Sequence, residues 1–324
     1  MKSSNILVTG GAGFIGSHLV KRLVNLGANV TVTVKYKSII DCSRLVSIWN
    51  KIDIVESDLR NLDSILYLKS IKNKFDIIFH LAAYNHVGDS FHHFNESLTT
   101  NILGTANILE YGPDYDRFIY TATSEVYGFQ RDLPFKEENI PFPVSPYAIG
   151  KYSGELYANL KKYQNDKQII CLRPFNTFGP YQSERAIIPE LIIKCLKGDE
   201  IRTTLGKQTR EFNYVDNIVD AFILAAKVSI IPNCPINIGS AEEISIRKLV
   251  KKIHQLTNSK SKLSIGVLKN RPTEIWRMKA ENKKAKSILD WEINISFEKG
   301  LIKTIDWFEN FIDLYFGKNS ISRL

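Results

Sequence analysis

The sequence predicts an α/β fold in which a doubly wound parallel sheet is followed by a smaller C-terminal lobe. A glycine-rich turn at residues 9–16 joins an apolar strand to an amphipathic helix. Strand and helix patterns then alternate as far as Leu172, which favours parallel strands joined by right-handed helical crossovers. After Arg173-Pro174 the pattern becomes irregular and richer in proline, which indicates the second lobe.

The glycine-rich turn reads Thr-Gly-Gly-Ala-Gly-Phe-Ile-Gly. It follows an apolar strand from Asn5 to Val8 and opens a helix that we expect to run to Leu26. Glycines at its tightest points let a diphosphate approach the backbone, and the helix N-terminus offers N–H groups and a positive dipole end. The turn therefore predicts a dinucleotide site of the Rossmann type, formed by Gly10, Gly13, Phe14, Ile15 and Gly16.

The end of the second predicted strand, residues 30–34, bears on the choice of dinucleotide. In many NAD-binding folds an acidic residue there accepts hydrogen bonds from the ribose. This chain has Lys35, Lys37 and Ser38 instead, which can bind a 2′-phosphate that an acid would repel. We therefore prefer NADP to NAD, although a lysine pair is also typical of a solvated loop.

Two later strands are expected to complete the dinucleotide site. Residues 52–55 read as a strand that leads to Asp58 and Leu59, and the carboxylate is a candidate acceptor for the adenine amino group. Residues 76–83 form a continuous apolar run, typical of a strand covered on both faces. Its small C-terminal residues allow close approach of the cofactor, whereas a histidine inside the run is expected to be a core residue. The residues of this end that are expected to contact the cofactor are Leu81, Ala82 and Ala83.

The second lobe is expected to be built from separate parts of the chain. We assign residues 1–173 to the dinucleotide-binding domain, with returns to it near 211–240, and residues 174–210 and 241–324 to the smaller lobe. Helices near 98–111 and 147–163 are expected between strands.

The bulk composition is that of an ordinary globular chain, 324 residues long and 44% hydrophobic. Its net charge of +9 comes from lysines dispersed over many segments, so nucleic acid is not expected as a partner. No apolar run approaches the roughly 20 residues of a membrane helix, and the first strand begins too early to leave room for a signal peptide. A cytoplasmic protein without membrane contact is expected, and the four dispersed cysteines predict no metal site.

Tyr147 and Lys151 form a candidate catalytic pair. Ser145 is a good N-cap and Pro146 a good first residue for a helix, on which the pair shares one face. An ammonium there is expected to lower the pKa of the phenol from about 10 toward working pH and so make it a base for alcohol oxidation. Tyr and Lys at this spacing also occur by chance, so the pair alone does not assign an activity.

Thr123 and Glu125 follow a predicted strand that ends at Thr121. They are therefore expected at the C-terminal edge of the sheet, where open α/β sheets bind ligands. Thr123 is a donor for the reacting oxygen. Glu125 adds a second acid or base, which simple alcohol oxidation does not need.

With these motifs the chain resembles the extended short-chain dehydrogenase/reductase family, in its branch of nucleotide-sugar dehydratases and epimerases. The resemblance runs from Asn5 to about Trp291. The motifs that carry it are residues 9–16, 80–83 and 123–128, Tyr147 with Lys151, and residues 173–176 and 208–215. It implies a nucleotide-diphosphate sugar as substrate, NADP or NAD as cofactor, and a homodimer formed through the helices near 98–111 and 147–163.

The resemblance also implies a role for each catalytic residue. Tyr147 takes the proton from the sugar 4-hydroxyl, Lys151 holds the nicotinamide ribose and tunes Tyr147, and Thr123 orients the oxygen. Hydride passes from carbon 4 to the cofactor. Glu125 then removes the proton on carbon 5 and assists loss of the 6-hydroxyl as water, and return of the hydride to carbon 6 completes a 4,6-dehydration.

One departure from the family pattern bears on the substrate. Thymidine-linked glucose dehydratases have Asp-Glu where this chain has Ser124-Glu125, so a separate acid for the leaving hydroxyl is missing. Residues 173–189 resemble most the 4,6-dehydratases of N-acetylglucosamine nucleotides in legionaminic acid pathways. A UDP- or GDP-linked N-acetylhexosamine or hexose is therefore expected. A UDP-sugar 4-epimerase, which does not need Glu125, and a UDP-glucuronate decarboxylase, which uses it, stay open as alternatives.

The residues expected to bind the nucleotide sugar follow from the same resemblance. Arginines are suited to grip the diphosphate, an asparagine contributes an amide, and apolar side chains can sandwich the base. Arg185 is equally well explained as a solvated loop residue. The expected substrate-binding residues are Asn176, Arg185, Ile188, Pro189, Leu205, Arg210 and Arg271.

Overall fold

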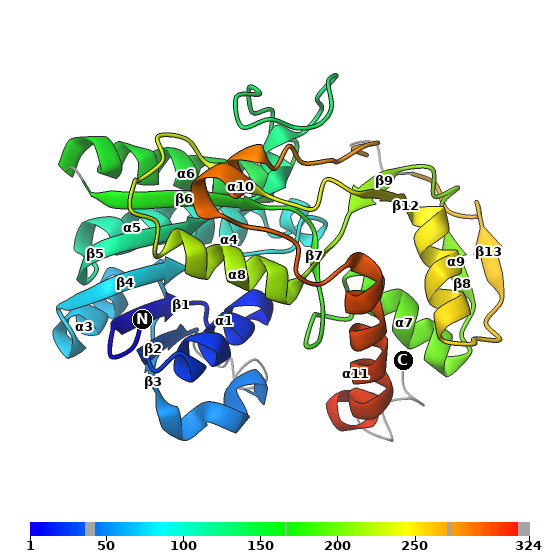
Figure 1. Cartoon of the computed structure of the whole chain (residues 1–324), viewed down its shortest axis with the longest axis horizontal. Coiled ribbons are helices and arrows are strands. Elements are labelled where there is room, and N and C mark those ends of the chain that lie inside the picture. The colour runs from blue at the N-terminus through cyan, green and yellow to red at the C-terminus, as the bar shows by residue number, and fades with distance from the viewer. Residues whose placement is uncertain (36–42, 166, 271–273, 317–324) are drawn as a thin grey trace.

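The computed structural model describes residues 1–35, 43–165, 167–270 and 274–316, and it confirms the predicted α/β class. A seven-stranded parallel sheet has the strand order β11-β6-β5-β4-β1-β2-β3 (Figure 1). Its strands are β1 (Asn5–Thr9), β2 (Asn29–Val34), β3 (Ile52–Glu56), β4 (Lys74–His80), β5 (Asp114–Thr121), β6 (Gln168–Pro174) and β11 (Ile236–Ile238).

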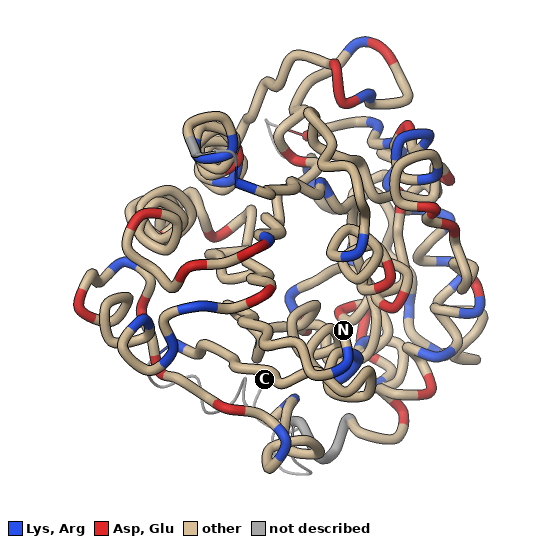
Figure 2. Tube along the Cα trace, turned by 60° about the vertical axis from the view of Figure 1, so that its left-hand side comes forward, with Lys and Arg blue, Asp and Glu red and all other residues tan. Residues whose placement is uncertain are grey.

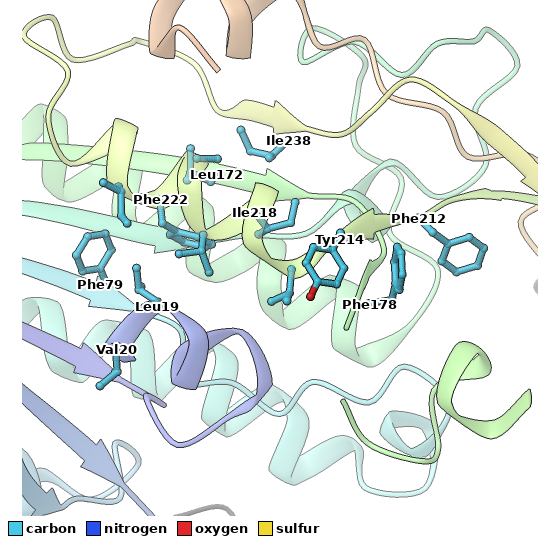
Figure 3. Packing of buried hydrophobic residues seen from close by; sticks show 14 of the residues in the cluster. Leu19, Val20, Phe79, Leu172, Phe178, Phe212, Tyr214, Ile218, Phe222 and Ile238 are labelled. Carbon is cyan, nitrogen blue, oxygen red and sulfur yellow. The ribbon is translucent and has the colours of Figure 1, made fainter. Parts of the chain in front are cut away.

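Helices cover both faces of the sheet. Successive side chains of a strand point to opposite faces, and because apolar residues of these strands lie on both faces, both need to be buried. In β1, Ile6 and Val8 join one buried cluster and Leu7 joins the other. The first cluster lies under α1 (Phe14–Asn25) and α8 (Val215–Ala225), where Phe79 and Phe222 pack edge to face with ring centroids 6.4 Å apart (Figure 3). The second lies under α3 (Leu62–Ile71), α5 (Gly104–Tyr111) and α6 (Pro146–Asn165).

Shorter helical segments connect the strands. Two helical turns precede α5 without a break, so the helix predicted over residues 98–111 is composed of α-helical and π-helical parts. The short segments are η1 (Ser43–Lys51), η2 (Asp89–Phe91), α4 (Phe94–Leu98), the π-helical η3 (Thr99–Leu103) and η4 (Ser124–Tyr127).

The remaining elements lie outside the central sheet. Most of them form a smaller layer to its right in Figure 1, whereas α10 (Lys283–Leu289) lies against β11 and α8 of the sheet layer. They pair as two-stranded sheets, β7 with β10, β9 with β12 and β8 with β13. The elements are β7 (Thr177–Phe178), α7 (Ile187–Lys197), β8 (Ile201–Thr203), β9 (Thr209–Glu211), β10 (Asn213–Tyr214), β12 (Glu243–Ser245), α9 (Ile246–Leu256), β13 (Leu263–Ile265), α10 (Lys283–Leu289) and α11 (Phe297–Phe316). By contrast, α8 packs on α1 and β11 extends the sheet beside β6, so both belong with the sheet.

The fourth strand ends at His80, before the end of the apolar run from which it was predicted. His80 is fully buried, with Nδ1 2.9 Å from the Thr9 hydroxyl and Nε2 3.1 Å from the Thr105 hydroxyl. Burial lowers its pKa to about 3. The histidine is therefore a neutral core residue, as predicted, and Leu81, Ala82 and Ala83 form the turn that follows it.

Charged residues are spread over many segments, with Lys and Arg interspersed among Asp and Glu (Figure 2). Within the described residues, no helix has both the length and the apolar character to cross a bilayer, and no group of three His, Cys, Asp or Glu is placed to hold a metal ion.

Candidate active site

Two cavities meet at the glycine-rich turn. The inner cavity, about 260 Å³, is lined by Gly10, Gly13, Phe14, Ile15, Gly16, Leu81, Ala83, Asn85, Val87, Thr121, Ala122, Thr123, Ser124, Glu125, Tyr147, Lys151, Pro174, Phe175, Asn176 and Thr177. The outer cavity, about 430 Å³, is lined by Gly10, Ala12, Gly13, Phe14, Thr33, Val34, Lys35, Arg44, Ser57, Asp58, Leu59, Arg60, Leu81, Ala82, Ala83, Asn85, Thr100 and Ser183. Every described residue that the sequence predicted for the cofactor lines at least one of them.

The glycine-rich turn needs glycine for two reasons, close packing of its backbone and access of a diphosphate to that backbone. Gly10 has φ +68°, and a Cβ there would lie 2.7 Å from the backbone of Ala82. A Cβ on Gly16 would lie 2.3 Å from the Gly10 carbonyl oxygen. Gly13 is the N-cap of α1 and provides no side-chain cap, so the first N–H groups of this helix are left to bind an anion where the two cavities meet.

The outer cavity has charged side chains at the ends of β2 and β3. The Lys35 ammonium lies 2.6 Å from the Glu96 carboxylate. Arg60 holds the Asp58 carboxylate through its side chain, with distances of 2.9 and 2.5 Å, and lowers the pKa of Asp58. Arg44 completes the cationic lining. Lys37 and Ser38 lie outside the described residues.

The inner cavity brings together the four residues predicted to be catalytic, Thr123, Glu125, Tyr147 and Lys151. Thr123 is the N-cap of η4 and its hydroxyl accepts from the Glu125 N–H at 3.2 Å. It is also hydrogen-bonded to the Tyr147 hydroxyl, and the Glu125 carboxylate acts electrostatically on that phenol. The phenol and the carboxylate therefore lie on the same cavity.

Burial sets the protonation of the Tyr147 and Lys151 pair. It raises the pKa of Tyr147 to about 12, against the lowering effect of the Thr123 hydrogen bond. It also lowers the pKa of Lys151 to about 7. The expectation that Lys151 brings the phenol pKa down is therefore wrong for the protein alone, because loss of solvent has the largest effect on the phenol and disfavours its anionic form. The Lys151 ammonium lies 4.5 Å from the centre of the Tyr120 ring.

A third cavity, the side cavity, opens toward the second lobe with a volume of about 300 Å³. It is lined by Asn85, His86, Val87, Gly88, Asn176, Thr177, Phe178, Gln182, Ala186, Ile187, Ile188 and Phe212. Of the residues predicted to bind substrate, Asn176 and Ile188 lie here, and Asn176 also lines the inner cavity. The other four described candidates line none of these three cavities.

These four residues have other surroundings. Pro189 is buried in α7 and Leu205 is about half exposed. The exposed Arg185 donates to Asp89 at 2.9 Å. Arg210 pairs with Glu274 at 2.7 Å and donates to the Ile275 carbonyl oxygen at 2.6 Å. Arg271 lies outside the described residues.

Ser124 has a structural role. It is 3% exposed, and its hydroxyl lies 3.6 Å from the sulfur of Met278, which is itself 3.5 Å from the Asn176 amide. Among the described residues that line the inner cavity, Glu125 alone has a carboxyl group.

Sequence reasoning missed Asn85, Arg44 and Arg60. Asn85 lines all three cavities, and its only sequence signal is its place just after the β4 run. Arg60 follows Asp58 closely, but only the fold shows that the two side chains join in the outer cavity.

Comparison with known proteins supports the resemblance seen in the motifs. The dTDP-D-glucose 4,6-dehydratase of Homo sapiens is 31% identical over 329 residues, covering 95% of this chain and 91% of that protein. The UDP-N-acetyl-alpha-D-glucosaminuronate decarboxylase of Bacillus cytotoxicus is 34% identical over 318 residues, covering 93% and 97%.

Solved structures show the same fold. Epimerase Mth375 from Methanothermobacter thermautotrophicus superposes with a TM-score of 0.90 at 28% identity, covering 98% of this chain and 95% of that one. The UDP-glucuronic acid 4-epimerase of Bacillus cereus, solved with UDP-glucuronic acid and NAD, has a TM-score of 0.86 at 28% identity, with coverage of 95% and 99%. A model of the family described as GDP-mannose 4,6 dehydratase matches residues 7–304, and this chain therefore belongs to that family.

Proposed function

We propose that this protein is a nucleotide-sugar 4,6-dehydratase that uses a nicotinamide dinucleotide. The observation that carries the proposal is the meeting of the Glu125 carboxylate, the Tyr147 phenol and the Thr123 hydroxyl on one cavity. A 4-epimerase needs the phenol and the cofactor but has no use for a carboxylate beside them. Relatives that include a 4,6-dehydratase at 31% identity are consistent with this activity.

A dinucleotide fits the residues that line the inner and outer cavities. The uncapped start of α1 is suited to the diphosphate, and both cavities are lined by Gly13 and Phe14 at that helix start, so each nucleoside half would have a cavity of its own. Lys151, which is 2% exposed and lines the inner cavity, would donate to the ribose beside the reacting ring. When bound, the dinucleotide supplies a hydride acceptor for carbon 4 of the sugar and a hydride donor for carbon 6.

The side chains of the inner cavity then divide the proton transfers. Tyr147 accepts the proton of the sugar 4-hydroxyl, and the Thr123 hydroxyl, already hydrogen-bonded to the phenol, holds the same oxygen in place. Glu125 takes the proton from carbon 5 and returns a proton to the 6-hydroxyl as it leaves as water. One carboxyl group has both tasks because Ser124, beside it, faces Met278 and has no acidic proton to give.

We propose that the side cavity and the second lobe bind the nucleotide sugar, with residues 1–173 and the returns near 211–240 as the dinucleotide-binding domain. Asn176 is central to this proposal because it lines both the inner and the side cavity. The resemblance of residues 173–189 to legionaminic acid pathway dehydratases favours a UDP- or GDP-linked N-acetylhexosamine. Arg185, Pro189, Leu205, Arg210 and Arg271 remain proposed substrate contacts.

The cations of the outer cavity favour NADP over NAD. Lys35, Arg44 and Arg60 all line this cavity, and cationic side chains are suited to bind a 2′-phosphate. In the sequence, Lys35 and not an acid follows the last residue of β2, the place where an acid would accept from the free ribose hydroxyl.

Mass spectrometry tests the reaction directly. The protein is incubated with UDP-N-acetylglucosamine, GDP-N-acetylglucosamine, GDP-mannose and UDP-glucuronate, each with NADP or NAD. We expect loss of water from one of the first three. Loss of carbon dioxide from UDP-glucuronate identifies a decarboxylase instead, and an isomer of unchanged mass identifies an epimerase.

Replacement of the carboxyl group gives the first specific prediction. Glu125→Gln keeps the shape of the side chain but removes the base, so we expect water loss to slow by about two orders of magnitude or more while oxidation at carbon 4 persists. Reduced nicotinamide absorbance reports the oxidation, and mass spectrometry reports the water loss. Unchanged turnover in Glu125→Gln would discard the assignment.

A further inference from the structure

A buried ionic network joins the two elements that carry the catalytic residues. Arg173 of β6 donates to the Glu155 carboxylate through Nε at 2.9 Å and Nη2 at 2.6 Å, and to the Tyr127 hydroxyl through Nη1 at 2.9 Å. The Tyr127 hydroxyl in turn donates to Asn237 Oδ1 at 2.6 Å. All four side chains are at most 3% exposed.

The ends of this network lie next to the catalytic groups in the chain. Glu155 is on α6, one turn after Lys151 and two turns after Tyr147, on the same face of the helix. Tyr127 is in η4, the turn that begins with Ser124 and contains Glu125. Arg173 lies between them on β6, which packs against α6.

Other contacts hold Tyr127 from its far side. The Arg173 guanidinium lies 4.9 Å from the centre of the Tyr127 ring, and the ring packs against Phe135 with centroids 5.1 Å apart. Asn237 is fixed by its amide to the Phe135 carbonyl oxygen at 2.9 Å. These contacts hold the Tyr127 side chain in one arrangement. Because Glu125 is two residues earlier in the same short helix, they also restrict where the Glu125 backbone lies.

We propose that Arg173, Glu155 and the Tyr127 hydroxyl are positioning residues that set the Glu125 carboxylate against the Tyr147 phenol. This inference rests on the proposed dehydratase function. The bidentate pair has a fixed planar geometry, and a fully satisfied buried network favours one arrangement of the elements that it joins. Removal of the Tyr127 hydroxyl breaks the hydrogen-bonded link between η4 and α6. It keeps the ring packing of Tyr127, the N-cap Thr123, and the pair of Tyr147 and Lys151 on their helix. Elimination should therefore suffer and oxidation should not.

The test is Tyr127→Phe, which removes one oxygen and keeps the ring packing. In single turnovers with the sugar that the wild type dehydrates, we expect water loss to slow on the order of tenfold while oxidation at carbon 4 stays within about twofold. KM and the Kd for NADP should not change. Tyr115→Phe is the matched control, because Tyr115 is also a buried tyrosine but lies at the N-terminal end of β5, whereas η4 follows the C-terminal end of that strand. It should leave both steps unchanged.

Each other outcome overturns the proposal. Equal slowing of both steps in Tyr127→Phe indicates a purely structural network, and no slowing indicates that the hydroxyl has no role. If Tyr127→Phe does not fold, Asn237→Ala removes the acceptor of the Tyr127 hydroxyl and is read in the same way. If the wild type dehydrates none of the tested sugars, the proposed function fails and this inference fails with it. If the wild type dehydrates a sugar but Tyr127→Phe slows both steps equally, only this inference fails.

Discussion

At the scale of a single residue, burial of the Lys151 ammonium in the site lowers the free energy of unfolding. Its side chain is 2% exposed, and burial lowers its pKa from 10.5 to about 7. Between these two values the unfolded chain binds a proton that the folded protein does not, so the free energy of unfolding rises with pH in that window. Below pH 7 the full cost of burying the ammonium is present.

Lys151→Met should therefore stabilise the cofactor-free protein. We expect a gain on the order of 2 kcal/mol near pH 6 that shrinks as the pH approaches 10, because the neutral amine carries little penalty. Urea denaturation at both pH values measures the change. The control is Lys227→Met, at an exposed lysine, which should change little at either pH. A loss of stability in Lys151→Met at about pH 6 would contradict the assignment of a buried, costly ammonium.

Lys35 provides a residue-scale test of cofactor choice. Lys35→Met removes one cation from the outer cavity, so we expect the Kd for NADP to rise about tenfold or more and the Kd for NAD to stay within about twofold. Quenching of intrinsic fluorescence on titration gives both constants. Lys51→Met, at an exposed lysine that does not line the cavity, should leave both unchanged. Parallel weakening of NADP and NAD by Lys35→Met would show that Lys35 does not recognise the 2′-phosphate.

At the scale of elements, one face of α6 carries residues of the inner cavity and of the buried network, and another face of the same helix is apolar and exposed. Tyr147, Lys151 and Glu155 lie on the first. The second shows an apolar stripe at helical spacing, which η3 and α5 continue. The residues of this surface are Leu103, Tyr111, Ile149, Leu156, Leu160 and Tyr163, each between 44% and 70% exposed.

We propose that this surface forms the homodimer expected from the resemblance. Leu156→Glu places a charge in the centre of the stripe, so we expect a dimeric wild type to become a monomer at micromolar concentration. Light scattering after size exclusion measures the mass. Leu66→Glu on α3 is the matched control, because Leu66 is 46% exposed and Leu156 is 51% exposed, but Leu66 lies outside the stripe. A monomeric wild type, or a dimeric Leu156→Glu, would contradict this interface.

At the scale of the whole molecule, the site lies where the strand order reverses. β1 and β4 are neighbours in the sheet although two strands separate them in the chain, and the crossovers leave β1 and β4 in opposite directions. Gly10 and Leu81 follow the C-terminal ends of β1 and β4, and both residues line the inner and the outer cavity. The second lobe closes the inner cavity from the other side through Asn176 and Thr177.

Much of this arrangement was predictable because it rests on local signals. The turn at 9–16, the alternation in β2 and the spacing of Tyr147 and Lys151 are each fixed within a few residues, and all are found as predicted. The substrate contacts were less predictable. The place of Asn85 in the cavities and the pairing of Arg210 with Glu274 depend on segments that are far apart in the sequence, so no short pattern predicts them.

The sequence by itself determined the fold class, the glycine turn and the chemical groups of the site, since backbone conformation and the period of apolar residues are local properties. Tertiary structure alone decided which groups meet and in which protonation state. Glu125 comes to Tyr147 only through η4 and α6, and the pKa values of Tyr147 and Lys151 diverge because the packed chain removes water from both. Desolvation depends on the surroundings in space, which a spacing of four residues along a helix does not specify.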